Sequence, residues 1–306
     1  MGASAPRFMH DTTYYLLVAL ALLAVGLPRI SNHFLFPPAG VWAKWIRWAL
    51  VSGVFAALME TTGWSTRPLW VHLLIGAGLW FLFETVYNWL IIAALSRSPL
   101  PLFPKFRENS DGDEWPAQAR FIRMKDWLRE NNYTSIAALK AELFEDNFLR
   151  VSVYENSEEG IRIQILFVPK GNNSSSVFYS INSLGADDAR LITDNHSLPF
   201  GGYYPDSWLH LRKPMVGSLS CLCRIHRKRA SKLAFESIGF TEKPLDELND
   251  QQRYLENLNI HSGIIVPISK QEEDGMLTEK GRYRIWIEMW LIAYFGKARS
   301  HRVANG

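Results

Sequence analysis

Cysteine is almost absent from this sequence, whose 306 residues contain only Cys221 and Cys223. One residue separates them, whereas structural zinc sites use cysteine pairs two to four residues apart. Two thiols on one short stretch are also poorly placed to form a disulfide with each other. We therefore expect reduced thiols, no metal site, and a position for this region on the reducing, cytosolic side of a membrane.

The chain also lacks a surplus of charge and the short motifs that name a reaction. Lys and Arg number 33 against 30 Asp and Glu, a net charge of +3, so no nucleic-acid partner is expected. The sequence contains no Walker loop and none of the patterns GxGxxG, HExxH and GxSxG. No cofactor is expected, and the simplest routes to an enzyme are missing.

Charge is scarcest in residues 70–95, which contain no Lys, Arg or Asp and a single Glu in 26 residues. A helix rises about 1.5 Å per residue, and a bilayer core needs roughly 20 apolar residues, so this segment is long enough to span a membrane. The apolar stretches 12–27 and 41–59 are predicted to span as well. The sequence thus predicts an α-helical membrane domain of three transmembrane helices over residues 1–95.

The first apolar stretch, 12–27, has a second interpretation as a signal peptide, because 16 residues are few for a span. The preceding tail carries one Arg offset by Asp11, and no A-x-A cleavage site follows, so we expect a retained helix. Pro37 and Pro38 are expected in a turn before the second span.

Basic residues beside the spans predict the orientation of the chain. The first loop, the start of the second span and the segment after the third span together carry Arg29, Lys44, Arg47, Arg97, Lys105 and Arg107. The N-terminal tail and the second loop carry only Arg7 and Arg67. The positive-inside rule then places the N-terminus outside, and the C-terminal domain in the cytoplasm, of a plasma or inner membrane.

Polar residues recur along one face of the third span, at His72, Gly76, Trp80, Glu84 and Asn88. A carboxylate such as that of Glu84 is costly in lipid, so it is expected to face the helix bundle, a cavity or a partner. One interpretation is an ion, proton or lipid site in a small oligomeric channel or transporter subunit. The other is a neutral Glu84 hydrogen-bonded to a neighbouring helix, with Gly76 allowing close packing.

The remainder of the chain has an ordinary soluble composition and predicts a domain of the α+β class. Residues 96–114 are predicted to form a linker, and residues 115–306 a cytoplasmic domain. Helices are predicted over 115–130 and 134–144 from apolar stripes at helical spacing. The period then changes to two, and four antiparallel strands are predicted over 148–154, 161–168, 177–184 and 189–193.

Residues 194–214 show little periodicity and are rich in Gly, Pro and aromatic residues. They also contain Asp194, His196, Asp206 and His210, which are candidates for acid/base or metal chemistry, although no pair has a recognised ligand spacing. Two interpretations stay open. The segment is the binding loop of a membrane-associated enzyme, or it is an ordered loop that covers one end of the sheet.

A basic helix is predicted over 218–237. Its charged residues are Arg224, Arg227, Lys228, Arg229 and Lys232. Such a helix can lie on an anionic leaflet, where each cation contributes about 1 kcal/mol, or it can be a solvated face. Nucleic acid is disfavoured because no base-reading motif accompanies the charges, and His226 is expected to be packed.

The C-terminal part predicts a helix over 244–258, an edge strand at 264–268 and a second helix over 285–295. The last is too short to span a bilayer, so it is buried against the rest of the protein or lies among lipid headgroups. Together these features predict a multi-pass membrane protein that anchors a cytoplasmic binding or interaction module. Its expected partners are the bilayer, anionic lipid headgroups, and a protein or a second copy of the chain.

Overall fold

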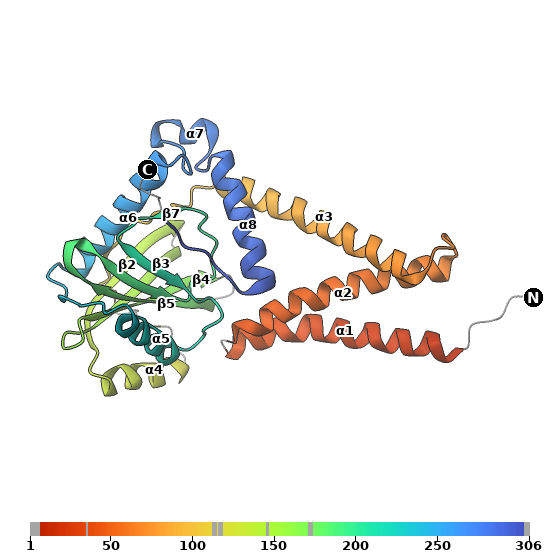
Figure 1. Ribbon diagram of the computed structural model, residues 1–306, viewed down its shortest axis with the longest axis horizontal. Coiled ribbons are helices and arrows are strands. Elements are labelled where there is room, and N and C mark those ends of the chain that lie inside the picture. Colours follow the sequence, from red (N-terminus) through yellow and green to blue (C-terminus); the bar gives the residue numbers. More distant parts are fainter. Residues whose placement is uncertain are drawn as a thin grey trace, which may run out of the picture. The chain divides into compact units, whose positions relative to one another are not determined.

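The computed structural model describes residues 7–34, 36–111, 115, 119–144, 147–170 and 174–302 (Figure 1). The chain divides into two compact units. The helical unit comprises Met1–Ile92 and Met289–Gly296, and the sheet unit comprises Ala93–Glu288 and Lys297–Gly306. Helices α3 (Leu69–Ser96) and α8 (Glu279–Phe295) contribute residues to both units.

The helical unit is built on α1 (Arg7–Phe34), α2 (Pro37–Thr62) and most of α3. Among the described residues, three segments are long and apolar enough to cross a membrane: Thr13–Ser31, Pro37–Thr62 and Leu69–Ser96. The prediction of three long apolar helices at the N-terminus is therefore confirmed. The expected turn at Pro37 and Pro38 was wrong, because both prolines belong to the first turn of α2, where a backbone N–H has no partner to lose.

Helices α2 and α3 approach each other closely at Gly76. A Cβ atom on Gly76 would lie 3.0 Å from both the Cβ of Phe55 and the Cα of Ser52. Next to it, the indole N–H of Trp48 donates a hydrogen bond to the carbonyl oxygen of Ala77 at 3.0 Å. The absence of a side chain at Gly76 thus allows the two helices to approach.

The larger sheet has seven strands in the described part of the chain, in the order β1-β2-β3-β4-β5-β6-β8. They are β1 (Arg107–Glu108), β2 (Thr134–Phe144), β3 (Asn147–Asn156), β4 (Ile161–Lys170), β5 (Ser174–Leu184), β6 (Arg190–Asp194) and β8 (Trp208–Arg212). Neighbouring strands are antiparallel, except that β6 and β8 are parallel. The four predicted strands correspond to β3–β6, which pair antiparallel as expected, but the prediction of a four-stranded sheet is wrong because the sheet has seven strands in the described part of the chain.

The strands that were not predicted come from three segments whose sequence patterns indicate other structures. Residues 134–144, predicted as a helix, form β2 and pair along β3. Residues 107–108, within the range predicted as a linker, form β1, and the Asn249 side chain accepts a hydrogen bond from the Phe106 N–H at 2.8 Å. The predicted loop 194–214 contains β8 and the short strand β7 (Tyr203–Tyr204).

Helices cover both faces of this sheet (Figure 1). One core lies between β4 and β5 and the helices α4 (Ala119–Glu130) and α5 (Leu219–Lys232), and it includes Phe121, Ile163 and Leu222. The second joins Leu139 and Val151 to Leu248 of α6 (Pro244–His261). Apolar residues on alternate sides of the strands thus face two separate layers.

The C-terminal segments differ from their predicted bounds. The basic helix α5 ends at Lys232, and Ile265 makes an isolated bridge to Leu277 where an edge strand was predicted. The short helices η1 (Ala186–Asp188), η2 (Ile268–Lys270) and α7 (Gln271–Asp274) lie in the connections. The last strand, β9 (His301–Arg302), pairs in parallel with β7.

Candidate functional site

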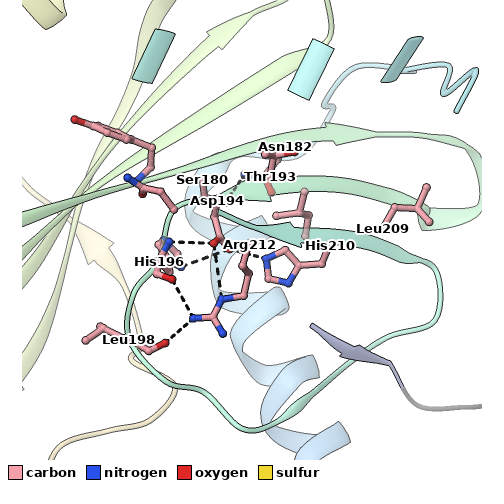
Figure 2. Close-up of polar contacts among 12 residues, drawn as sticks. Ser180, Asn182, Thr193, Asp194, His196, Leu198, Leu209, His210 and Arg212 are labelled. Carbon is pink, nitrogen blue, oxygen red and sulfur yellow. Dashed lines mark hydrogen bonds and ion pairs between the residues drawn. The ribbon is translucent and has the colours of Figure 1, made fainter. Parts of the chain in front are cut away.

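The parallel pairing of β6 with β8 brings a group of polar side chains to one edge of the sheet (Figure 2). Asp194 ends β6, Arg212 ends β8, and the two residues are register partners. The carboxyl ends of parallel strands meet at the same edge, and the connection between these two strands returns over that edge. The candidate residues therefore gather there because β6 and β8 pair in parallel, which sequence periodicity did not predict.

Three of the four candidates in residues 194–214 lie together. His210 Nε2 is 2.5 Å from Asp194 Oδ2, and His196 Nδ1 is 3.7 Å from the same oxygen. The backbone N–H of His196 also donates to Asp194 Oδ1 at 3.1 Å. The fourth candidate, Asp206, is partly exposed in the turn before β8, and no contact joins it to this group among the described residues.

Arg212 completes the cluster and holds the chain that follows β6. Its guanidinium forms a buried ion pair with Glu288 of α8 and donates to the carbonyl oxygens of His196 at 3.2 Å and Leu198 at 2.5 Å. Glu288 Oε2 accepts the backbone N–H groups of Phe200 at 2.9 Å and Gly201 at 2.7 Å. The ion pair thus ties residues 196–201 to α8.

A close approach at Gly201 makes this arrangement possible. Gly201 has φ +65°, and a Cβ there would lie 2.8 Å from the side chain of Ile285. A glycine adopts this backbone conformation without steric cost, whereas other residues do not. The loop can therefore place two amides on Glu288 only with glycine at this position.

Burial and charge set the ionisation of the cluster. Burial raises the pKa of Asp194, but His196, His210 and Arg212 together outweigh it and hold that pKa well below its usual range. Burial lowers the pKa of His196, and Asp194 opposes the shift only in part. Burial also opposes the charge of Arg212, yet Tyr204, Glu288 and Asp194 raise its pKa. At neutral pH the cluster therefore holds an ionised Asp194, a charged Arg212 and a neutral His196.

The chemistry available to this cluster is that of a carboxylate–histidine pair. His210 Nδ1 and His196 Nε2 are buried without a hydrogen-bond partner in the described part of the protein. The Tyr204 ring covers His210 at a centroid separation of 4.2 Å. Within the described ranges, no group of three His, Cys, Asp or Glu residues could hold a metal ion. The pair can accept or relay a proton, and the ion pair beside it keeps the loop in place.

A buried carboxyl group lies in the helical unit, at Glu84. Its carboxylate accepts hydrogen bonds from the ammonium of Lys44 on α2 and the hydroxyl of Tyr294 on α8. Tyr294 stacks on Trp290 at a centroid separation of 4.8 Å and contacts Trp45 edge-on at 5.3 Å. Glu84 thus has two partners within the unit, one of them positively charged.

The other polar residues of α3 share this face of the helix. His72 and Gly76 are buried, and Trp80 and Asn88 are partly buried. His72 Nε2 has no hydrogen-bond partner among the described residues. The repeat of four therefore marks the side of α3 that is covered by protein.

The five basic residues of α5 serve different purposes. Arg227 pairs with Glu159 at 2.8 Å, and Arg229 donates to the carbonyl oxygens of Ile192 at 2.8 Å and Leu209 at 2.9 Å. Arg224, Lys228 and Lys232 are exposed. These three can therefore meet a surface partner without breaking the contacts that Arg227 and Arg229 make.

Beneath them, His226 is fully buried and satisfied at both ring nitrogens. Nε2 lies 3.1 Å from Ser183 Oγ, and Nδ1 lies 3.0 Å from Thr193 Oγ1. Burial, followed by the charges of Arg229 and Arg227, lowers the pKa of His226 to about 3. His226 is therefore a neutral hydrogen-bonding group of the core.

Comparisons with protein-family models, with curated proteins and with solved structures found no match to this chain.

Sequence reasoning missed the partners that hold the candidate residues. Arg212 had a usable signal, because Trp208, His210 and Arg212 alternate with Leu209 and Leu211, the pattern of a strand. Lys44, Tyr294 and Glu288 had none, since each pairs with a residue distant in the sequence.

Proposed function

We propose that this chain is a multi-pass membrane protein that holds a cytoplasmic binding module at the bilayer. The observation that carries the proposal is the outward-facing apolar surface of the helical unit. Leu22 is 70% exposed, Leu74 63% and Leu90 64%. Soluble monomers rarely expose contiguous apolar patches above a few hundred Å², so lipid is the solvent that suits these helices.

The distribution of basic residues supports an orientation with the sheet unit in the cytoplasm. The predicted outer segments carry Arg7 and Arg67, whereas the predicted inner segments carry most of the flanking Lys and Arg. The free thiols of Cys221 and Cys223 are compatible with that compartment.

The binding element that we propose is the segment that follows β6. Its backbone is held by Arg212 and Glu288, while Leu198 at its tip is 56% exposed. A rigid backbone with an apolar side chain at its surface lowers the entropic cost of binding. The partner is a protein, and a second copy of this chain is one such protein.

The exposed cations of α5, Arg224, Lys228 and Lys232, support an additional contact with anionic headgroups. Glu84 has a structural function in this proposal. Its pairing with Lys44 removes the isolated charge that an ion path through α3 would use.

Extraction of the full-length protein tests the proposal. The protein is expected to stay in the membrane pellet after alkaline carbonate and to be released by a non-ionic detergent. Release by carbonate alone, as a dispersed monomer, would contradict membrane anchoring. For the binding element, replacing Leu198 with Asp is expected to abolish partner or self-association in detergent, while Ile122→Asp, at an exposed site on α4, leaves it intact.

A membrane-associated enzyme is the second candidate, and the short Asp194–His210 contact with an unpartnered His210 Nδ1 favours it. A panel of ester and phosphoester substrates, assayed with the wild type and His210→Gln, tests this function. Turnover that is lost in His210→Gln and kept in Asp206→Asn supports an enzyme. Turnover unaffected by His210→Gln removes this cluster as its source.

A further inference from the structure

Cations that take no part in the Asp194 cluster lie beside Tyr203. The Arg284 guanidinium carbon lies 4.0 Å from the Tyr203 ring centroid, and Lys280 Nζ lies 5.5 Å from it. The pairing of β7 with β9 places His301 beside Tyr203 and Arg302 beside Tyr204. The start of α8 and the end of the chain thus bring positive charge to one short strand pair.

Carboxylates do not neutralise this group. Within the residues that the structure describes, no ion pair involves Lys280, Arg284, Arg299 or Arg302. Lys280 donates to the Ser262 carbonyl oxygen at 3.2 Å, and Arg284 reaches the Gly202 carbonyl oxygen only at 3.5 Å, with its Nε buried and unpartnered. The donors therefore have unused capacity.

The charge of Arg284 also acts on His301. Burial lowers the pKa of His301, with Arg284 and Arg299 adding to the shift and Glu288 opposing it. Glu288, the acid that acts on His301, is already paired with Arg212. Two cations beside one aromatic ring, with no ion-pair partner among the described residues, suit an anionic ligand.

We infer that Lys280, Arg284 and His301 form a binding site for the phosphate group of an anionic ligand. Arg presents a planar fork of donors to phosphate oxygens, and Lys adds a mobile point charge. Lys280 is exposed, and Arg284 and His301 are partly exposed, so a ligand can reach them from solvent.

Two sources supply such a phosphate, a lipid headgroup or a soluble phosphorylated molecule. The residues that directly precede Lys297 in the chain, Met289–Gly296, belong to the helical unit. A headgroup is therefore the source that agrees with membrane anchoring, and only this choice of source rests on the proposed function.

Thermal unfolding of the full-length protein in neutral detergent tests the site in two arms. One arm adds inorganic phosphate, and the other adds phosphatidic acid to the micelles, with phosphatidylcholine as its blank. A rise in Tm with both probes, or with inorganic phosphate alone, indicates a site for soluble phosphate. A rise with phosphatidic acid alone indicates a headgroup site. No rise with either probe overturns the inference.

Variants assign the response to these residues. Lys280→Gln/Arg284→Gln is expected to weaken binding at least tenfold, whereas Arg253→Gln, which removes an exposed charge from α6, leaves it unchanged. If the double variant lowers the Tm of the unliganded protein, binding is measured with the single variant Lys280→Gln instead, because Lys280 is exposed and makes one long hydrogen bond. A phosphatidic acid response that survives the double variant but is lost in Arg224→Gln/Lys228→Gln belongs to α5 and overturns the site. Carbonate extraction reports on anchoring independently of all these outcomes.

Discussion

At the scale of residues, buried charges are held by specific partners in both units. Glu288 balances Arg212 in the sheet unit, and Lys44 balances Glu84 in the helical unit. Such pairs offset the desolvation free energy of their charges only while both members are present. Loss of one partner is therefore more damaging than loss of an equivalent surface charge.

Replacing Arg212 with Met is expected to destabilise the sheet unit by about 3–5 kcal/mol, because it leaves Glu288 buried and unpaired. The measurement is thermal or denaturant unfolding in detergent. Arg253→Met is the control, since Arg253 pairs with Asp250 at an exposed position and its loss is expected to cost under about 1 kcal/mol. Adding Glu288→Leu to Arg212→Met is expected to recover part of the loss, and equal costs for the Arg212 and Arg253 variants would refute the prediction.

The pH dependence of stability is expected to follow His226. Its pKa is about 3 in the folded protein, against about 6.5 for an unperturbed histidine. Between these values the unfolded state binds the additional proton, so stability is full above about pH 6.5 and falls with acid, by up to about 1.4 kcal/mol per pH unit. Tm measured from pH 7.5 to 4.5 checks this, and His226→Gln is expected to flatten the curve. The same slope in that variant would contradict it.

The sequence identified several site residues but not the pairs that hold them. Asp194, His196 and His210 stood out because they cluster in an irregular, aromatic-rich segment, and Glu84 because it is the lone acid in an apolar run. Which residues join them depends on tertiary contacts between positions far apart in the chain. Glu288 in particular lies in the apolar run 285–295, whose pattern fits both a buried helix and a helix among lipid headgroups.

At the scale of elements, β2 shows where periodicity and structure disagree. Its apolar residues Ile136, Leu139 and Leu143 have helical spacing, and its Ala, Lys and Glu residues favour helices. The structure instead buries Leu139 and Ala141, which alternate with Lys140, and pairs the segment with β3. Pairing with a neighbouring strand outweighs a weak helical preference, and the strength of that pairing cannot be read from a single sequence.

The packing of α2 on α3 can be tested at two glycines of α3. Gly76→Leu is expected to force the helices apart, because its Cβ would meet the Cα of Ser52 at 3.0 Å. Gly78→Leu is the matched control, since a Cβ there meets nothing within 4 Å. Cross-linking between cysteines placed on α2 and α3, together with Tm in detergent, measures the effect. Equal behaviour of the two variants would show that Gly76 does not set the packing.

At the scale of the whole molecule, composition predicted more than periodicity did. The apolar first third and the polar remainder correspond to three long apolar helices followed by a sheet-rich domain. Composition could not predict that α8 contributes to both units, because its 17 residues are too short for a span and give no sign of where they pack. Nor could it predict the parallel pairing of β6 with β8, which creates the candidate site.

We propose that the apolar helices cross a bilayer and leave the sheet unit on the cytoplasmic side. Thiol labelling in cells tests it, in a Cys221→Ser/Cys223→Ser background. Trp64→Cys places one thiol between α2 and α3, where Trp64 is 82% exposed, and Asn257→Cys places one on the exposed surface of α6. A membrane-impermeant reagent is predicted to label position 64 in intact cells and position 257 only after permeabilisation. Labelling of both positions from the same side would contradict the account.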